Sequence, residues 1–187
     1  MKPPLHIAFL TGQSDPHSCA LTATQTRFLR ELPVPEAAKL YLNFPYDPGL
    51  PEARPIPLAL ASWNNVRQSL EALAPGFARR YAPPVAAVIE RAERTLFLAG
   101  SCGIHLLRSL RLPPALMHRL AVFAYGPVAL GRPDCRHLIV GSEGDRISRA
   151  FFPRPDVMVN SDHLRYLDDP ALVAACRAFL RTLDGGC

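Results

Sequence analysis

The sequence predicts a three-layer α/β/α sandwich around a mostly parallel sheet of about six strands. Short runs of the chain are almost wholly apolar, as expected of strands that are buried on both faces. Longer stretches between them carry apolar residues at helical spacing. Strands that alternate with helices are typical of parallel sheets covered on both sides. We find no internal repeat and no domain boundary, so we expect a single domain over residues 1–187.

The strands are predicted from apolar runs bounded by turn residues. The expected ranges are 5–10, 39–46, 95–99, 120–125, 137–140 and 156–159. Between residues 45 and 57 the chain carries five prolines. Each proline removes a backbone donor, so this segment is expected to be a loop.

The helices are predicted from apolar residues three and four positions apart. The expected ranges are 21–32, 58–73, 77–93, a helix from residue 104, and a last helix from residue 170. Pro83 and Pro84 disturb the third of these. The last helix has a clear start, with Asp169 as N-cap and Pro170 at its first position, and Gly185–Gly186 is expected to end it.

Composition favours a globular cytoplasmic protein. Hydrophobic residues make up 49% of the chain, and no apolar run approaches the roughly 20 residues that a membrane-spanning helix needs. The first ten residues lack the long apolar region and cleavage site of a signal peptide. Five cysteines, none in a C-x-x-C pair, suggest reduced thiols and no zinc site. We therefore expect no metal, no cofactor and no membrane association.

The formal net charge of +5 comes from scattered arginines rather than a basic run. A solvated surface explains this pattern, and no nucleic-acid partner is expected. The alternative explanation of the charge is that the arginines form a basic rim that faces an acidic partner, such as an acyl carrier protein. The oligomeric state stays open.

The segment 99–103 (AGSCG) joins the predicted strand 95–99 to a helix. A sharp strand-to-helix turn is crowded and needs small residues two positions before and after its centre, which Ala99 and Gly103 supply around Ser101. Such a turn exposes the Ser101 hydroxyl and directs the next backbone N–H, that of Cys102, at the same space.

This motif resembles the G-x-S-x-G nucleophile elbow of the α/β-hydrolase superfamily, with alanine at the first position. The resemblance spans Leu5 to Leu183 and is to the smallest, lid-less esterase- and thioesterase-like members, because the connection from Tyr125 to Arg136 is too short for a lid. It implies a minimal α/β-hydrolase fold with Ser101 as nucleophile. A register shifted by one makes Cys102 the alternative nucleophile, but β-branched Ile104 then occupies a crowded position.

Two further segments resemble the superfamily's acid and base positions. The segment 141–145 (GSEGD) follows the fifth strand and matches the acid turn at Asp145, with Glu143 as the fallback. Turn chemistry alone also explains an Asp there. His163 follows the sixth strand and precedes the last helix, where the superfamily has its base. His118 and His137 begin strands and so lie at the wrong end of a parallel sheet.

The order Ser101, Asp145, His163 is the order of nucleophile, acid and base in this superfamily. The oxyanion hole needs a second N–H from the loop after the first strand. There Gln13 follows Gly12, in a place like the family's His-Gly-x turn. We therefore expect the N–H groups of Gln13 and Cys102 to form the hole, although threonine replaces the usual histidine at position 11.

The resemblance implies a serine hydrolase that cleaves a carboxylic ester or thioester, or transfers the acyl group, through an acyl-enzyme on Ser101. Its substrate would be a small-molecule acyl ester or a carrier-bound thioester. The alternatives are an inactive binding or scaffold protein with this fold and a Cys102-dependent hydrolase or acyltransferase. An acyl pocket and ordinary helix packing both explain one further set of apolar residues: Leu58, Trp63, Phe77 and Tyr81.

Overall fold

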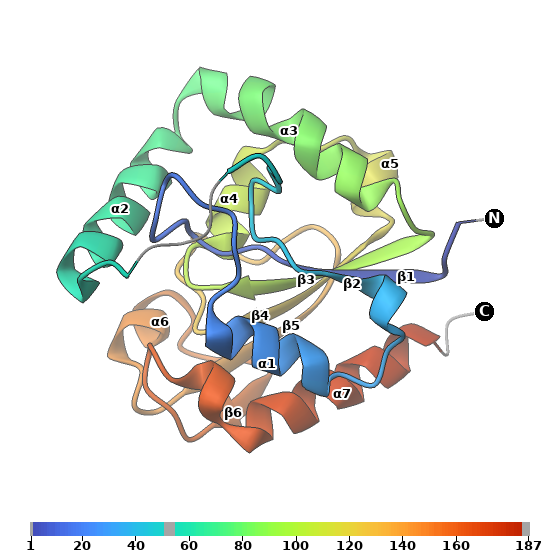
Figure 1. The fold of residues 1–187 in the computed structure, drawn as a ribbon. Helices are drawn as coiled ribbons and strands as arrows, with labels where there is room; N and C mark the ends of the chain where they lie inside the picture. The colour runs from blue at the N-terminus through green and yellow to red at the C-terminus, as the bar shows by residue number, and fades with distance from the viewer. Residues whose placement is uncertain (1, 51–54, 185–187) are drawn as a thin grey trace.

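The computed structural model describes residues 2–50 and 55–184. Its six strands form one all-parallel sheet in the order β2-β1-β3-β4-β5-β6, with helices on both faces (Figure 1). The strands are β1 (Leu5–Phe9), β2 (Lys39–Leu40), β3 (Arg94–Gly100), β4 (Leu120–Tyr125), β5 (Arg136–Ser142) and β6 (Val157–Val159). The predicted three-layer sandwich is confirmed.

Helices between the strands supply the two outer layers. They are α1 (Ala23–Glu31), α2 (Leu58–Glu71), α3 (Pro75–Ile89), α4 (Gly103–Ser109), α5 (Pro114–Met117), α6 (Arg146–Phe151) and α7 (Pro170–Asp184), with 3-10 helices η1 (Glu36–Ala38) and η2 (Tyr166–Asp168). Thr22 starts α1 with a capping box, in which it and Gln25 bind each other's backbone N–H. The short helices α5 and α6 were not expected from the sequence.

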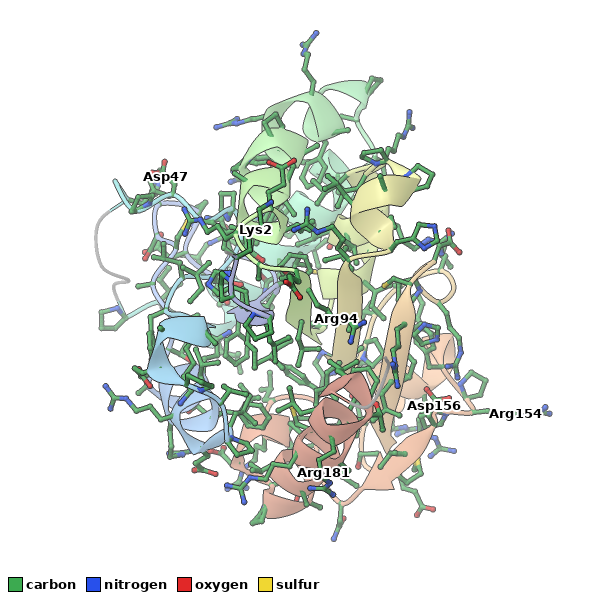
Figure 2. All side chains as sticks on the ribbon, turned by 90° about the vertical axis from the view of Figure 1, so that its right-hand side faces the viewer. Lys2, Asp47, Arg94, Arg154, Asp156 and Arg181 are labelled. Carbon is green, nitrogen blue, oxygen red and sulfur yellow. The ribbon has the colours of Figure 1, made fainter. Side chains whose placement is uncertain are left out.

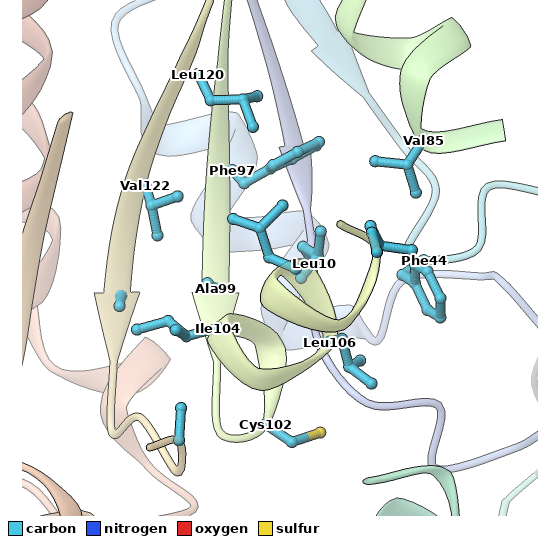
Figure 3. Close-up of a cluster of buried hydrophobic side chains, with 14 of the residues drawn as sticks. Leu10, Phe44, Val85, Phe97, Ala99, Cys102, Ile104, Leu106, Leu120 and Val122 are labelled. Atoms are coloured by element: carbon cyan, nitrogen blue, oxygen red, sulfur yellow. The ribbon is translucent and has the colours of Figure 1, made fainter. Parts of the chain in front are cut away.

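The core lies on both faces of the sheet because successive strand side chains point to opposite sides. In β3, Phe97 and Ala99 pack in the cluster that contains the buried side chains of α3 and α4 (Figure 3). Leu96 and Leu98, from the same strand, pack in the cluster under α1 and α7. This two-sided burial explains why the central strands are apolar runs.

The second strand is shorter than the predicted range 39–46. Asn43 turns away from the sheet, and its side chain accepts the Thr11 N–H at 3.0 Å and donates to the Thr11 carbonyl at 3.3 Å. Phe44 is fully buried against Phe77, with ring centres 6.1 Å apart. Side-chain contacts thus hold this segment as a turn that anchors the loop after β1.

Helix boundaries also differ in places from the predicted ones. Helix α3 runs through Pro83 and Pro84 without ending there, but it begins and ends earlier than the range 77–93. Helix α7 begins at Pro170, as its cap signals predict. Its predicted end at Gly185–Gly186 lies outside the described residues.

Because all strands are parallel, their amino ends lie at one edge of the sheet and their carboxyl ends at the opposite edge. Figure 2 views the end where the strands begin, and there Arg94 donates a hydrogen bond to the Leu183 carbonyl, which links β3 to α7. Nearby Asp156 pairs with Arg132 at 2.8 Å. The carboxyl ends of the strands lie opposite, where open α/β sheets bind their ligands.

Candidate active site

The turn between β3 and α4 has the backbone of a strained elbow. Ser101 has a φ of 50°, in the left-handed region that non-glycine residues rarely adopt. A Cβ on Gly103 would lie 2.0 Å from the backbone oxygen of Leu10 and 3.1 Å from the Ala99 Cβ. Only small side chains fit on both sides of Ser101, as the crowding argument predicts.

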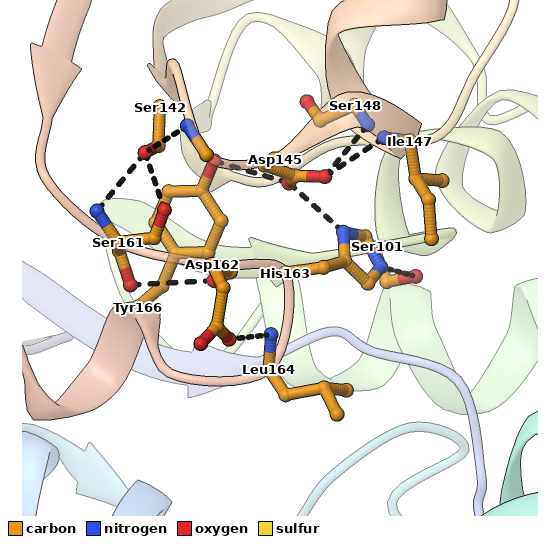
Figure 4. Close-up of polar contacts among 11 residues, drawn as sticks. Ser101, Ser142, Asp145, Ile147, Ser148, Ser161, Asp162, His163, Leu164 and Tyr166 are labelled. Carbon is orange, nitrogen blue, oxygen red and sulfur yellow. Dashed lines mark hydrogen bonds and ion pairs between the residues drawn. The ribbon is translucent and has the colours of Figure 1, made fainter.

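The structure brings the three predicted site residues into one chain of contacts (Figure 4). Ser101 Oγ lies 3.4 Å from His163 Nε2, and His163 Nδ1 lies 2.9 Å from Asp145 Oδ2. Because an ionised carboxylate only accepts hydrogen bonds, we assign the imidazole proton to Nδ1. The lone pair of Nε2 then faces the Ser101 hydroxyl. The contact of 3.4 Å is long, as such contacts often are before substrate binds.

The side chain of Asp145 is fully buried and surrounded by donors. As the N-cap of α6 it accepts the N–H groups of Ile147 at 3.1 Å and Ser148 at 3.0 Å on Oδ1. Oδ2 accepts from His163 and from the Tyr166 hydroxyl, the latter at 3.1 Å. Four donors stabilise a charge that would be costly to bury without them.

The fallback acid is not in this arrangement. Glu143 lies in the same turn but is exposed, and it is Asp145 that contacts His163. Asp145 also has the structural role that its place in a turn suggests, since its side chain caps the N-terminus of α6. The capping and the imidazole contact use different oxygen atoms of the same carboxylate.

Ser142 holds the loop that carries His163, a role that the sequence did not reveal. Its hydroxyl is buried, donates to the Ser161 carbonyl at 2.5 Å and accepts the Ser161 N–H at 2.9 Å. The same oxygen accepts the Gly144 N–H at 3.3 Å. The acid turn and the loop after β6 are therefore joined at one side chain. Ser142 stands in the quoted acid motif, but nothing in the sequence identified its partner.

The geometry favours Ser101 over Cys102. Cys102 is only 5% exposed and belongs to the buried cluster drawn in Figure 3. Burial raises the pKa of the Cys102 thiol above its usual value, which disfavours the reactive thiolate. A Cβ on Gly12 would lie 2.9 Å from its sulfur, so the loop after β1 packs directly over it. His163 instead contacts the Ser101 hydroxyl.

The predicted oxyanion donor Gln13 is already hydrogen bonded. Its N–H donates to Gln68 Oε1 of α2 at 2.8 Å, and Gln68 Nε2 donates to Gln13 Oε1 at 3.0 Å. Both residues are buried. Gln68 thus occupies the N–H that the sequence assigned to the oxyanion hole. The two residues are 55 positions apart, so no local pattern could have revealed the contact.

The four apolar residues that either an acyl pocket or ordinary helix packing would explain are divided between the core and the surface. Phe77 is buried in the core, while Leu58 and Trp63 are 60% and 63% exposed. Tyr81 lines a cavity of about 750 Å³ that Gln13 and Gln68 also line. Phe77 and Tyr81 of α3 pack together with ring centres 4.8 Å apart, whereas α2 presents Leu58 and Trp63 to solvent.

Within residues 2–50 and 55–184, no group of three or more His, Cys, Asp or Glu side chains is arranged to hold a metal ion. No helix in that same part of the chain is long and apolar enough to cross a membrane.

No protein-family model and no curated protein matches the sequence. Solved structures do match: esterase PE8 aligns with a TM-score of 0.53 and 16% identity over 97% of this chain and 93% of its own. The chain has the α/β-hydrolase fold. A provisional α/β hydrolase of unknown function from Agrobacterium tumefaciens aligns at 0.51 and 12% identity, over 98% of this chain and 87% of its own. At these identities the likeness concerns the fold alone.

Proposed function

We propose that the protein is a serine hydrolase that cleaves a carboxylic ester or thioester through an acyl-enzyme on Ser101. The observation that carries the proposal is the continuous contact from Ser101 through His163 to Asp145 on an α/β-hydrolase fold. The fold likeness to a protein named as an esterase is consistent with this reaction.

In the proposed reaction, His163 Nε2 takes the Ser101 proton while Oγ attacks the acyl carbonyl. Asp145 keeps the imidazole proton on Nδ1 and stabilises the imidazolium that forms. The imidazolium then protonates the leaving alcohol or thiol. Water, or another acceptor in an acyl transfer, attacks the acyl-enzyme and regenerates the Ser101 hydroxyl.

The developing oxyanion is stabilised by backbone N–H groups beside the elbow. We assign these to Cys102 and Gln13, because Gly12 lies against Cys102 and brings the loop after β1 to the elbow. The N–H of Gln13 must first leave Gln68 Oε1. Turnover therefore includes a small rearrangement of this hydrogen bond.

A fluorophosphonate probe tests the proposal, because it reacts with an activated serine. The wild-type protein should label, Ser101→Ala should not, and Cys102→Ala should label like wild type. A panel of p-nitrophenyl esters and acyl thioesters, with and without a nucleophilic acceptor, then separates esterase, thioesterase and acyltransferase activity. Labelling that is lost only in Cys102→Ala would contradict the assignment of Ser101.

One observation favours a second candidate, a non-catalytic binding protein with this fold. The occupied N–H of Gln13 leaves the proposed oxyanion hole incomplete until Gln68 moves. A folded wild-type protein that neither labels nor hydrolyses any ester of the panel would favour this candidate.

A further inference from the structure

We propose that Tyr166 is a positioning residue, whose hydroxyl fixes the Asp145 carboxylate and limits how strongly it binds the His163 imidazole. This inference rests on the proposed function, because it assigns a role within the same site. The observation behind it is that Tyr166 and His163 donate to the same oxygen, Asp145 Oδ2, at 3.1 and 2.9 Å.

Tyr166 is buried beside Asp145 and is packed against neighbouring residues. It begins η2, three residues after His163, and only 1% of the residue is exposed. Its ring lies 6.1 Å from that of Tyr125 in β4. Gly126, with a φ of 51°, allows this approach, since a Cβ there would lie 2.7 Å from the Tyr166 ring and 3.1 Å from Asp145 Oδ2. The position of the hydroxyl is therefore fixed by packing.

The phenol can act only as a donor toward this carboxylate. Burial, together with the nearby negative charge of Asp145, raises the pKa of Tyr166 well above its usual value. The hydroxyl therefore keeps its proton throughout the range in which a histidine acts as a base. An O–H donor to a carboxylate is a charge-assisted hydrogen bond, which is stronger than a bond between neutral groups.

Sharing Oδ2 has two consequences for the base. The second donor fixes the plane of the carboxylate, whose other oxygen is held by the N–H groups of Ile147 and Ser148. It also withdraws negative charge from Oδ2 and so weakens the hydrogen bond from His163 Nδ1. Tyr166 thus sets both the orientation and the strength of the Asp145–His163 contact.

The experiment compares Tyr166→Phe with wild type by NMR of the His163 Nδ1 proton and by steady-state kinetics. Without the competing donor, the Nδ1 proton should move downfield because its bond to Oδ2 strengthens. The carboxylate also loses the donor that fixes its plane, so the imidazole is less well oriented and kcat for a p-nitrophenyl ester should fall about 10-fold while KM stays unchanged. A residue that only fills space would alter stability without moving the proton resonance.

Tyr125→Phe is the matched control, because it removes a buried hydroxyl beside Tyr166 that interacts with Gln25 rather than with Asp145. It should leave the Nδ1 resonance and kcat at wild-type values. If Tyr166→Phe fails to fold, 3-fluorotyrosine at position 166 keeps the ring and strengthens the donor, and the Nδ1 proton should then move upfield.

A folded Tyr166→Phe protein with the wild-type Nδ1 resonance and kcat would overturn the proposal. An equal effect in Tyr125→Phe would also overturn it, since packing alone would then explain the result. The NMR measurement needs no turnover. Absence of fluorophosphonate labelling at Ser101 would therefore refute the proposed function without deciding the role of Tyr166.

Discussion

Removing the acceptor that occupies the proposed oxyanion donor should make the protein a faster hydrolase. In wild type, Gln68 Oε1 accepts the Gln13 N–H at 2.8 Å. The methionine of Gln68→Met has a similar length but cannot accept this hydrogen bond. The N–H is then free before the substrate arrives. We expect kcat/KM for a p-nitrophenyl ester to rise, which is unusual for the substitution of a buried polar residue.

The size of the increase follows from the hydrogen bond that wild type must break. Such a bond contributes about 0.5–1.5 kcal/mol net, which corresponds to about a 2- to 13-fold increase in rate. A single oxyanion donor stabilises the transition state by about 3–4 kcal/mol in a measured case. This exceeds the contribution of the Gln13–Gln68 hydrogen bond, so in wild type the Gln13 N–H should still bind the oxyanion in the transition state. The variant should lose stability, because Gln13 Oε1 loses its buried donor, at a cost of about 1–3 kcal/mol.

The assay is kcat/KM on a series of p-nitrophenyl esters, with thermal unfolding to verify that the variant is folded. Gln68→Glu is the control, since it retains an acceptor for the Gln13 N–H and adds a negative charge beside the developing oxyanion. It should lower kcat/KM. The reasoning is refuted if Gln68→Met stays folded and its kcat/KM is equal to or below that of wild type. Gln68 would then support the loop after β1 and would not compete with the oxyanion for the Gln13 N–H.

Three further predictions concern stability and thiol chemistry. Gly103→Ala should lower stability by about 3 kcal/mol in chemical denaturation, because its Cβ would lie 2.0 Å from the Leu10 carbonyl oxygen, whereas Gly76→Ala, with open space around its Cβ, should not. Burial lowers the pKa of His6, so below its usual pKa of 6.5 the unfolded state binds more protons and stability falls with acidification; His6→Gln should flatten this dependence between pH 7 and pH 5. Cys102, whose thiol pKa is raised by burial, should react with iodoacetamide at pH 8 only after unfolding, as mass spectrometry of the native and denatured protein can test.

The sequence predicts the sheet well because the signal for each central strand is local. A strand buried on both faces must be largely apolar, and β4 meets that condition throughout while β3 meets it from Leu96 onward. The exception is the range 39–46, where the apolar run is equally good but Asn43 and Phe44 form other contacts. Periodicity also predicted α2 without indicating that Leu58 and Trp63 would be exposed.

In the candidate site, too, the sequence revealed the residues that have a local signal and missed those that depend on contacts between distant positions. The elbow, the acid turn and the base each follow a strand, so the topology of a parallel sheet is enough to gather Ser101, Asp145 and His163 at one end. Gln68 and Tyr166 form hydrogen bonds to residues of the candidate site across 55 and 21 positions. Chain order can therefore identify the candidate nucleophile, acid and base, whereas the side chains that bind them depend on how distant segments of the chain pack. Substitution of Gln68 or Tyr166 should change the rate, while substitution of Ser101 should abolish it.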